Sequence, residues 1–283
     1  MAPPVWLITG ASNGFGLLLC LKAAAAGHTV IGTVRSKTKS AAAAQQIESA
    51  GGQVIELDLN ESKASITQKI AAVGPIDYLV NNAGFFILGA VEQVTAEEAH
   101  LQMQTNFLGP LYVTQAALPG MRAARAGTVV NVSSIAARDP QPTSGMYAAS
   151  KAALEAVSES LAAEVAPFNI SVLIVEPGAF RTNFLAAYAE PAGALPADYE
   201  GTTVDKARGY FAAFDGKQAG DPQKGVDRIY EALMGEGLAG GLKGKVTRLV
   251  IGPDALRRNR MKNDKFVADL ALAEEVALST DFD

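Results

Sequence analysis

Short apolar runs alternate with alanine-rich runs along most of the chain. The apolar runs are rich in β-branched residues and have the length of strands, whereas the alanine-rich runs are long enough to form helices. The pattern predicts seven strands, at Val5–Thr9, Thr29–Arg35, Gln53–Asp58, Tyr78–Asn81, Thr128–Val132, Ser171–Glu176 and Thr247–Ile251. It predicts six helices between them, at Gly14–Ala26, Lys39–Ala50, Glu61–Val73, Thr95–Ala124, Ser144–Ala166 and Pro222–Met234.

This alternation predicts a mostly parallel sheet. Parallel strands need long crossover connections, and right-handed crossovers place helices on both faces of the sheet. Strands that are covered on both faces read as continuous apolar runs, as residues 78–80 and 172–175 do. We therefore expect an α/β fold, a doubly wound, Rossmann-like three-layer sandwich with a seven-stranded parallel sheet.

Two segments do not follow the alternation of strand-like and helix-like runs. Residues 183–221 form a long stretch that contains glycine, proline and several aromatic residues, and its length is typical of a lid over a binding site. Residues 253–283 form a tail in which Arg257, Arg258, Arg260 and Lys262 precede acidic residues, a pattern that indicates a solvated helix face. With no internal repeat and no linker, we expect one domain over residues 1–283.

Composition narrows the class of protein. The chain has 283 residues, 49% of them apolar, and a net charge of −5, which favours a globular protein and argues against a nucleic-acid partner. The one cysteine, Cys20, excludes an intrachain disulfide and reads as a small buried residue. The most apolar helical stretch, residues 17–26, is too short to span a bilayer, and no export signal is visible. We therefore expect a cytoplasmic protein with no membrane partner.

A glycine-rich segment follows the first strand. In "TGASNGFG", Gly10, Gly14 and Gly16 let the backbone turn tightly before a helix whose N-terminus can bind an anion. The spacing differs from the G-x-G-x-x-G dinucleotide fingerprint, so a plain glycine-rich turn is the alternative. The pattern indicates a pyrophosphate site at the carboxyl end of the sheet.

The second strand bears on the type of cofactor. Val34 occupies the place where NAD-binding proteins carry a carboxylate for the ribose, and Arg35 follows it, 19 residues after Gly16. Ser36 and Lys37 extend the polar, cationic surface. This favours NADP(H) over NAD(H), although Arg35 and Lys37 as solvated loop charges are the alternative.

Tyr147 and Lys151 lie four residues apart on a predicted helix and so share one face. A nearby cation lowers the pKa of a tyrosine, and a phenol tuned in this way can exchange a proton with a carbonyl or an alcohol. Ser133 and Ser134, at the end of the fifth predicted strand, could stabilise the carbonyl oxygen. His28 and His100 fall outside these motifs, so we expect no histidine-based triad and no metal site.

Taken together, these motifs resemble the short-chain dehydrogenase/reductase family in its single-domain form. The matching segments occur in family order over most of the chain: "TGASNGFG" at residues 9–16, "DL" at Asp58 and Leu59, "NNAG" at residues 81–84, "TNFLG" with Asn106, "NVSS" ending at Ser134, "YAASK" at residues 147–151 and "EPGAFRT" at residues 176–182.

The resemblance implies roles for individual residues. Ser134, rather than Ser133, would polarise the carbonyl, Tyr147 would be the acid/base, Lys151 would also hold the nicotinamide ribose, and Asn106 would position a water. Asp58 would contact adenine and Thr182 the carboxamide. Structural roles are the alternatives for Asn106 and Asn82. The full set implied for the cofactor is Gly10, Ser12, Asn13, Gly14, Phe15, Gly16, Arg35, Asp58, Leu59, Asn82, Ala83, Gly84, Tyr147, Lys151, Pro177, Gly178, Phe180 and Thr182.

Aromatic residues suggest the kind of substrate. Phe184 and Tyr188 in the lid segment, and Phe85 and Phe86 after the "NNAG" turn, predict a pocket for a hydrophobic or aromatic ketone or secondary alcohol. The alternative is that these side chains only pack the lid onto the body.

Two readings of the function remain at this point. The leading hypothesis is an NADP(H)-dependent oxidoreductase for such a small-molecule substrate, and the other is a nucleotide-binding sensor, scaffold or non-redox catalyst on the same fold. The resemblance also implies a homodimer or homotetramer that pairs through the helices containing Asn106 and Tyr147.

Overall fold

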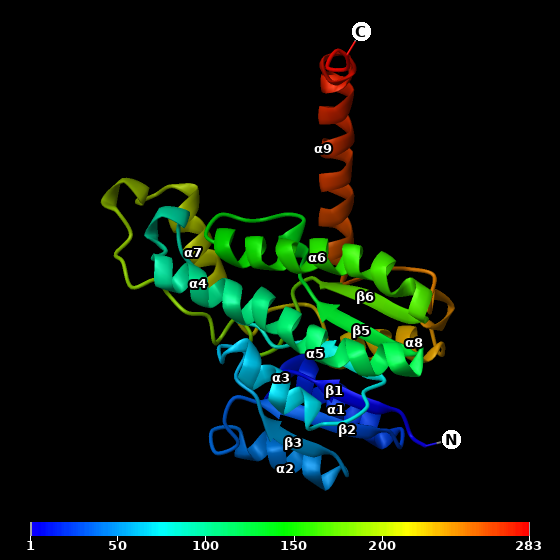
Figure 1. Ribbon diagram of the computed structural model, residues 1–283. Helices are drawn as coiled ribbons and strands as arrows, with labels where there is room; N and C mark the ends of the chain where they lie inside the picture. Colours follow the sequence, from blue (N-terminus) through cyan, green and yellow to red (C-terminus); the bar gives the residue numbers. More distant parts are fainter. Residues whose placement is uncertain (1, 283) are drawn as a thin grey trace.

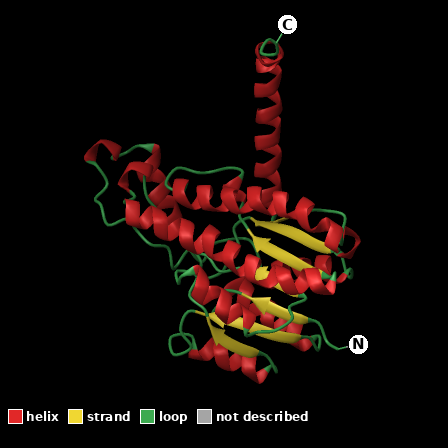
Figure 2. Ribbon diagram, in the orientation of Figure 1, coloured by secondary structure: helices red, strands yellow, loops and turns green. Residues whose placement is uncertain are grey.

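The computed structural model describes residues 2–282 and shows a parallel sheet between two layers of helices (Figures 1 and 2). The strand order is β3-β2-β1-β4-β5-β6-β7, and all six pairings are parallel. The predicted fold class is therefore confirmed. The strands are β1 (Val5–Ile8), β2 (Thr29–Val34), β3 (Gln53–Glu56), β4 (Tyr78–Asn81), β5 (Gly127–Val132), β6 (Ile170–Pro177) and β7 (Arg248–Ile251).

The helices of the two layers come from the alanine-rich segments. They are α1 (Gly14–Ala25), α2 (Ala41–Ser49), α3 (Lys63–Ala71), α4 (Ala96–Met103), α5 (Gly109–Ala124), α6 (Gly145–Val165), α7 (Thr203–Phe214), α8 (Pro222–Met234) and α9 (Pro253–Leu278). Short 3₁₀ turns and one π-helical turn, η2 (Gln104–Leu108), connect some of them.

Each face of the sheet has its own apolar core. Trp6 and Ile8 of β1 pack in the core beneath α1 and α8, whereas Leu7 packs in the core beneath α3 and α5. Because successive side chains of a strand point to opposite faces, burial of both sets explains why these strands are apolar throughout.

Two helical regions differ from the prediction. The expected helix over residues 95–124 is divided into α4 and α5 by the π-helical turn, and α7 forms inside the segment expected to be a lid loop. The tail contains the 26-residue helix α9, which rises away from the body with the C-terminus at its far end (Figure 1).

Candidate active site

The strand order reverses between β1 and β4, and the loops that follow these two strands touch. The side-chain amide of Asn82 donates to the carbonyl oxygens of Thr9 at 3.0 Å and Gly10 at 3.1 Å. The backbone N–H groups of Asn82 and Ala83 both bond the Thr9 hydroxyl. Such a reversal is where open parallel sheets bind ligands. Asn82 therefore joins the loop after β4 to the loop after β1, which is the structural role that the sequence offered as the alternative to cofactor binding.

The glycine-rich loop is built to approach an anion closely. Gly10 and Gly14 have φ values of 69° and 54°, and a Cβ on Gly16 would lie 2.3 Å from the Gly10 carbonyl oxygen. Asn13, the N-cap of α1, makes no side-chain cap bond and donates instead to the neighbouring Ser12 hydroxyl. The first-turn N–H groups of α1 thus have no side-chain cap, and the loop fits a pyrophosphate group.

The segment after β6 faces this loop. A Cβ on Gly14 would lie 3.4 Å from the Thr182 side chain, and the rings of Phe15 and Phe180 meet edge to face at 5.0 Å. The turn after Pro177 is held from α9, because Asp254 accepts a 2.9 Å bond from the Ala179 N–H. No side chain fits at Gly178, where a Cβ would lie 2.1 Å from the Asp254 carboxylate.

Three further residues of the implied cofactor set lie at the ends of β2 and β3. Arg35 follows β2 directly and is exposed. Asp58 is half-buried and accepts bonds from the N–H and side-chain amide of Asn60, while Leu59 is buried beside it. The structure thus brings these residues to the same edge of the sheet as the glycine loop.

Tyr147 lies near the N-terminus of α6 with 8% of its surface exposed. Burial raises the pKa of its phenol to about 12, and a hydrogen bond with Ser134 opposes this rise. Ser133, by contrast, donates at 2.6 Å to the buried carboxylate of Glu155. The hydroxyl that faces the phenol is therefore that of Ser134 and not that of Ser133, and its role on the carbonyl stays a prediction.

Lys151 is buried one turn further along α6. Its ammonium donates a 2.7 Å bond to the Val132 carbonyl oxygen at the end of β5. Burial lowers the pKa of Lys151 to about 8, and the charge of Glu155 raises it. For Tyr147 burial raises the pKa and only the hydrogen bond with Ser134 opposes it, so the lowering by Lys151 that the spacing predicted stays a prediction.

Asn106 lies in the π-helical turn and is fully buried. Its amide bonds both the N–H and the carbonyl oxygen of Phe85 at 3.0 Å, and it donates to the Ser150 hydroxyl at 3.1 Å. A Cβ on Gly84 would lie 3.3 Å from the Asn106 oxygen and 3.4 Å from the Lys151 nitrogen. The glycine therefore leaves a narrow cradle beside both polar groups. The hydrogen bonds to Phe85 and Ser150 support a structural role for Asn106. Its side-chain oxygen nevertheless lies beside Gly84 in the candidate site.

A partly buried ionic network around Arg248, which includes Glu155 of α6, was not predicted. Arg248 of β7 bonds the carboxylates of Glu155 at 2.5 Å and of Glu159, and it also bonds the fully buried Glu176. Asn259 of α9 donates to Glu176 at 3.0 Å. The i, i+4 spacing of Lys151 and Glu155 was the sequence signal that could have indicated a second charged group on this face.

Aromatic rings enclose the phenol. The Phe86 ring lies 5.0 Å from that of Tyr147 and the Phe184 ring lies 5.7 Å from it. Tyr188 and Phe211 of the lid segment join the same apolar cluster. Among the described residues Phe86, rather than Phe85, is the partner of the phenol after the "NNAG" turn. Backbone bonds between Ala189 and residues 86 and 88 fasten the lid to this wall.

The histidines and the cysteine lie elsewhere. Cys20 is buried, as predicted, and burial raises the pKa of its thiol to about 12. His100 is exposed on α4. His28 is more than the ordinary surface residue that was expected, because it accepts a 2.9 Å bond from the Trp6 indole and contacts the Tyr230 hydroxyl at 3.1 Å.

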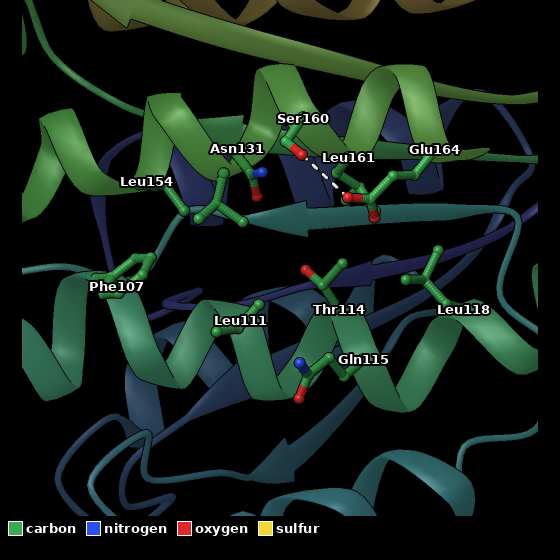
Figure 3. A pocket seen from close by; sticks show the side chains of 11 residues that line it. Phe107, Leu111, Thr114, Gln115, Leu118, Asn131, Leu154, Ser160, Leu161 and Glu164 are labelled. Atoms are coloured by element: carbon green, nitrogen blue, oxygen red, sulfur yellow. Dashed lines mark hydrogen bonds between the residues drawn. The ribbon is translucent and has the colours of Figure 1, made fainter. Parts of the chain in front are cut away.

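A groove runs between α5 and α6 on the outer side of the body. Figure 3 shows Phe107 and Leu111 on one wall and Leu154 and Leu161 on the other. Polar groups stand at its rim, where Ser160 donates to Glu164 at 2.9 Å. The π-helical turn, α5 and α6 thus present Phe107, Leu111 and Leu161 to this groove, while Leu154 is only 3% exposed.

Comparison with known proteins agrees with this geometry. The pattern of the short chain dehydrogenase family matches residues 4–192. The chain belongs to the short-chain dehydrogenase family. It is therefore an oxidoreductase of a family that uses nicotinamide cofactors and acts on CH–OH groups.

Individual relatives cover different shares of the chain. Oxidoreductase claN of Passalora fulva is 43% identical over 71% of this chain and 92% of its own length. The 3-ketodihydrosphingosine reductase of Bacteroides thetaiotaomicron is 42% identical over 65% of this chain and 66% of its own length. A short-chain dehydrogenase structure from Streptomyces avermitilis is 37% identical, with a TM-score of 0.86 over 99% of this chain and 100% of that chain.

Two more distant structures share the fold and contain cofactors. One, from Sphingobium yanoikuyae in complex with NADPH, is 22% identical with a TM-score of 0.72 and covers 99% of this chain and 96% of that chain. The other, from Burkholderia phymatum in complex with NAD, is 20% identical with a TM-score of 0.80 and covers 95% of each chain. Within residues 2–282, none of the helices is both long and apolar enough to cross a membrane.

Proposed function

We propose that this protein is an NADP(H)-dependent reductase of hydrophobic or aromatic ketones, with Tyr147 as the general acid. The observation that carries the proposal is a buried phenol that faces Ser134 and is surrounded by aromatic side chains. With a pKa near 12 the phenol holds its proton at neutral pH, which suits donation to a carbonyl oxygen. Oxidation of an alcohol would instead require a phenolate.

Each polar residue of the site has a separate role in the proposed reaction. Tyr147 donates the proton, and the Ser134 hydroxyl bonds the same carbonyl oxygen and stabilises the charge that develops there. Lys151, charged below its pKa of about 8, favours the phenolate left after donation. Asn106 positions a water in the path by which the proton is replaced. NADPH, when bound, supplies the hydride.

The residues at the switch point fit a dinucleotide. The α1 N-terminus with Gly10, Gly14 and Gly16 would hold the pyrophosphate, and Thr182 would hold the carboxamide end. Ser12, Asn13, Phe15, Asp58, Leu59, Asn82, Ala83, Gly84, Pro177, Gly178 and Phe180 would complete the groove. The exposed guanidinium of Arg35 supports a preference for the 2′-phosphate of NADP(H).

The lid, residues 183–221, would close over the substrate within one domain that spans residues 1–283. Phe184 and Tyr188 belong to the apolar cluster around Tyr147, with Phe85 in the adjoining loop, so the substrate would be apolar near its carbonyl. The relationship to a 3-ketodihydrosphingosine reductase, a protein named for a long-chain ketone, supports the same substrate class.

We further propose that two copies pair through the groove between α5 and α6, which gives a homodimer or, with a second interface, a homotetramer. The apolar side chains of Phe107, Leu111, Leu154 and Leu161 support this face as the contact (Figure 3). A cytoplasmic location agrees with the lack of a membrane-spanning helix among residues 2–282.

The test combines a fluorescence titration with an activity panel. The purified protein is titrated with NADPH and separately with NADH, and NADPH oxidation is then followed with aryl ketones, long-chain ketones and sugars. Tighter NADPH binding and turnover restricted to apolar ketones support the proposal. Tight NADPH binding with no oxidation across the panel would favour the nucleotide-binding sensor or scaffold, and preferred NADH binding would overturn the cofactor assignment.

A further inference from the structure

The base of α9, residues 253–263, contacts two loops of the candidate site. One loop follows β5 and contains Ser134, and the other follows β6 and contains Thr182. The match to the family pattern ends at residue 192, so it assigns no role to this helix. Its contacts therefore have to be explained from the structure alone.

Arg258 holds the loop after β5 at two points. Its Nε donates to the Asp139 carboxylate at 2.7 Å, and a terminal nitrogen donates to the Asp139 carbonyl oxygen at 2.6 Å. Lys262 adds an ion pair with the same carboxylate at 3.3 Å. The side chains of Arg258 and Asp139 are 24% and 17% exposed, so water reaches the pair only in part. Two bonds from one guanidinium fix the direction of the loop as well as its distance from the helix.

Asp139 is joined to Ser134 through a short 3₁₀ turn, η3 (Ile135–Ala137). The Asp139 N–H donates to the carbonyl oxygen of the first residue of this turn at 2.9 Å. Ser134 is the N-cap, and its hydroxyl oxygen accepts the Ala136 N–H at 3.1 Å. That bond leaves the hydroxyl proton free to be donated. By holding Asp139, Arg258 therefore fixes the turn that orients the Ser134 hydroxyl.

Asp254, in the first turn of α9, holds the loop after β6. Its carboxylate accepts the Ala179 N–H at 2.9 Å and lies against Gly178, where no side chain fits. Three residues beyond Ala179, the Thr182 side chain lies beside Gly14 of the glycine loop. The carboxylate therefore fixes the start of the segment that places Thr182.

The two contacts come from one face of a single helix. Asp254 and Arg258 are four residues apart and so lie on the same side of α9. Next to Arg258, Asn259 donates to the fully buried Glu176 at 3.0 Å, which ties the helix to the end of β6. A helix that is anchored in this way positions side chains more precisely than the loops would alone.

We propose that Arg258 and Asp254 are positioning residues of the active site with separate effects. Arg258 acts through Ser134 on the reacting carbonyl, and Asp254 acts through Thr182 on the nicotinamide end of the cofactor. This assignment rests on the proposed function, in which Ser134 bonds the carbonyl oxygen and Thr182 the carboxamide. Loss of Arg258 should lower kcat, whereas loss of Asp254 should weaken cofactor binding.

The first experiment compares Arg258→Met with Arg257→Met in NADPH-dependent ketone reduction. A displaced hydroxyl costs rate and not cofactor affinity, so Arg258→Met should lower kcat by about 10-fold and leave the NADPH affinity unchanged. Arg257 is exposed on the same helix and makes no ion pair within residues 2–282, so its variant should retain the full kcat. A full kcat for Arg258→Met, or equal losses in the two variants, would overturn the role of Arg258.

A double-mutant cycle separates positioning from a general effect on the fold. If Arg258 acts through Ser134, Arg258→Met should cause no further loss of kcat in a Ser134→Ala background. Equal fold losses in the two backgrounds would contradict the proposal. Arg258→Lys keeps the charge but not both bonds, so it should lose less kcat, and it replaces Arg258→Met in the cycle if that variant does not fold.

The role of Asp254 is tested with both cofactors. Asp254→Ala should weaken NADPH and NADH binding by the same factor, about 10-fold, because the nicotinamide end is common to the two molecules. At saturating NADPH its kcat should be retained. Asp264→Ala removes an exposed carboxylate from the same helix and is the matched control. A loss confined to NADPH, or a loss of kcat without a loss of affinity, would overturn the role of Asp254.

Amide hydrogen exchange tests the same contacts without turnover. Arg258→Met should raise exchange in residues 134–139 and leave residues 177–182 as in the wild type, and Asp254→Ala should do the reverse. If the wild type reduces no ketone but the variants show this pattern, the proposed function fails and the positioning of the two loops stands. Unchanged exchange, or the same increase in both loops for each variant, would refute the positioning roles.

Discussion

The ammonium of Lys151 and the carbonyl oxygen of Val132 are joined by a 2.7 Å hydrogen bond. This bond connects α6 to the end of β5, and β5 is followed directly by Ser133 and Ser134. The helix that carries the phenol and the strand end that carries Ser134 are therefore held together at the reacting centre. The bond also fixes a charged group in a buried place, which lowers the pKa of Lys151 to about 8.

Reduction should therefore lose rate in mildly alkaline solution. Below about pH 8 Lys151 is charged and Tyr147 is protonated, so both groups are in the form that proton donation requires. As the pH rises through about 8, Lys151 loses its proton while the phenol keeps its own, and kcat/KM should fall. The check is the pH profile of ketone reduction under saturating cofactor. A profile that stays flat to about pH 10 would contradict this assignment.

Glu155 should set the position of that alkaline fall. Its negative charge raises the pKa of Lys151, so Glu155→Gln should move the fall in kcat/KM to lower pH. We also expect a rate loss on the order of 10-fold, because Ser133 and Arg248 lose a charged acceptor. The measurement is the pH profile of the variant.

The matched control is Glu159→Gln. Glu159 bonds the same Arg248 but its side chain is 59% exposed. Its removal should leave the profile in place. Equal shifts in the two variants would show that only the ion pairs with Arg248 matter, and not the charge beside Lys151.

Sequence periodicity was sufficient for the sheet and for most helices. Strands such as β6, residues 170–177, are buried on both faces. A continuous apolar run in the sequence was therefore enough to predict them. The helix predicted over residues 95–124 was divided because Asn106 turns inward to bond the backbone of Phe85, and local propensity carries no information on that distant contact. Helix α7 was missed because Gly209 lies within it and none of its residues is fully buried, so no continuous apolar face marks it in the sequence.

The candidate site, too, could be predicted only in part from the sequence. Motif spacing was sufficient to name Tyr147, Lys151 and the glycine loop. It could not give the pKa of the phenol, which depends on burial by rings from three separate segments. It also could not join Arg248 to Glu155, which are 93 residues apart in sequence.

Tyr147→Phe should remove the proton donor and little else. We expect kcat to fall by about 10²- to 10⁴-fold, the usual contribution of a general acid. The ring contact with Phe86 would remain, so stability and NADPH affinity should change little. Steady-state rates and a fluorescence titration measure the two effects. The control is Tyr188→Phe, which removes a hydroxyl from the same apolar cluster and should retain most activity.

Arg35→Ala should weaken NADPH binding by about 10- to 100-fold and leave NADH binding nearly unchanged. The reason is that a charge-assisted bond to the 2′-phosphate contributes roughly 1.5–3 kcal/mol, and NADH has no such group. Parallel titrations with both cofactors measure the difference. Lys39→Ala removes an exposed cation from the same loop and serves as the control. Equal weakening in the two variants would identify Arg35 as a general surface charge.

His28 should make the fold less stable in mild acid. Burial lowers the pKa of its imidazole from 6.5, although the charge of Glu236 opposes this. In the folded protein the ring accepts the Trp6 indole N–H, and protonation would remove that acceptor. Since the folded pKa lies below the unfolded value, the stability is fully present above about pH 6.5. It is lost as the pH falls through the folded pKa.

The measurement is the urea midpoint of unfolding between about pH 5 and about pH 8. The wild-type midpoint should fall towards the acid end, and the fall should be smaller in His28→Gln, whose side chain does not titrate. His100→Gln is the matched control, because His100 is exposed on α4 and should leave the wild-type slope unchanged. If His28→Gln keeps the full acid slope, other groups cause it, and the contact between Trp6 and His28 contributes only packing.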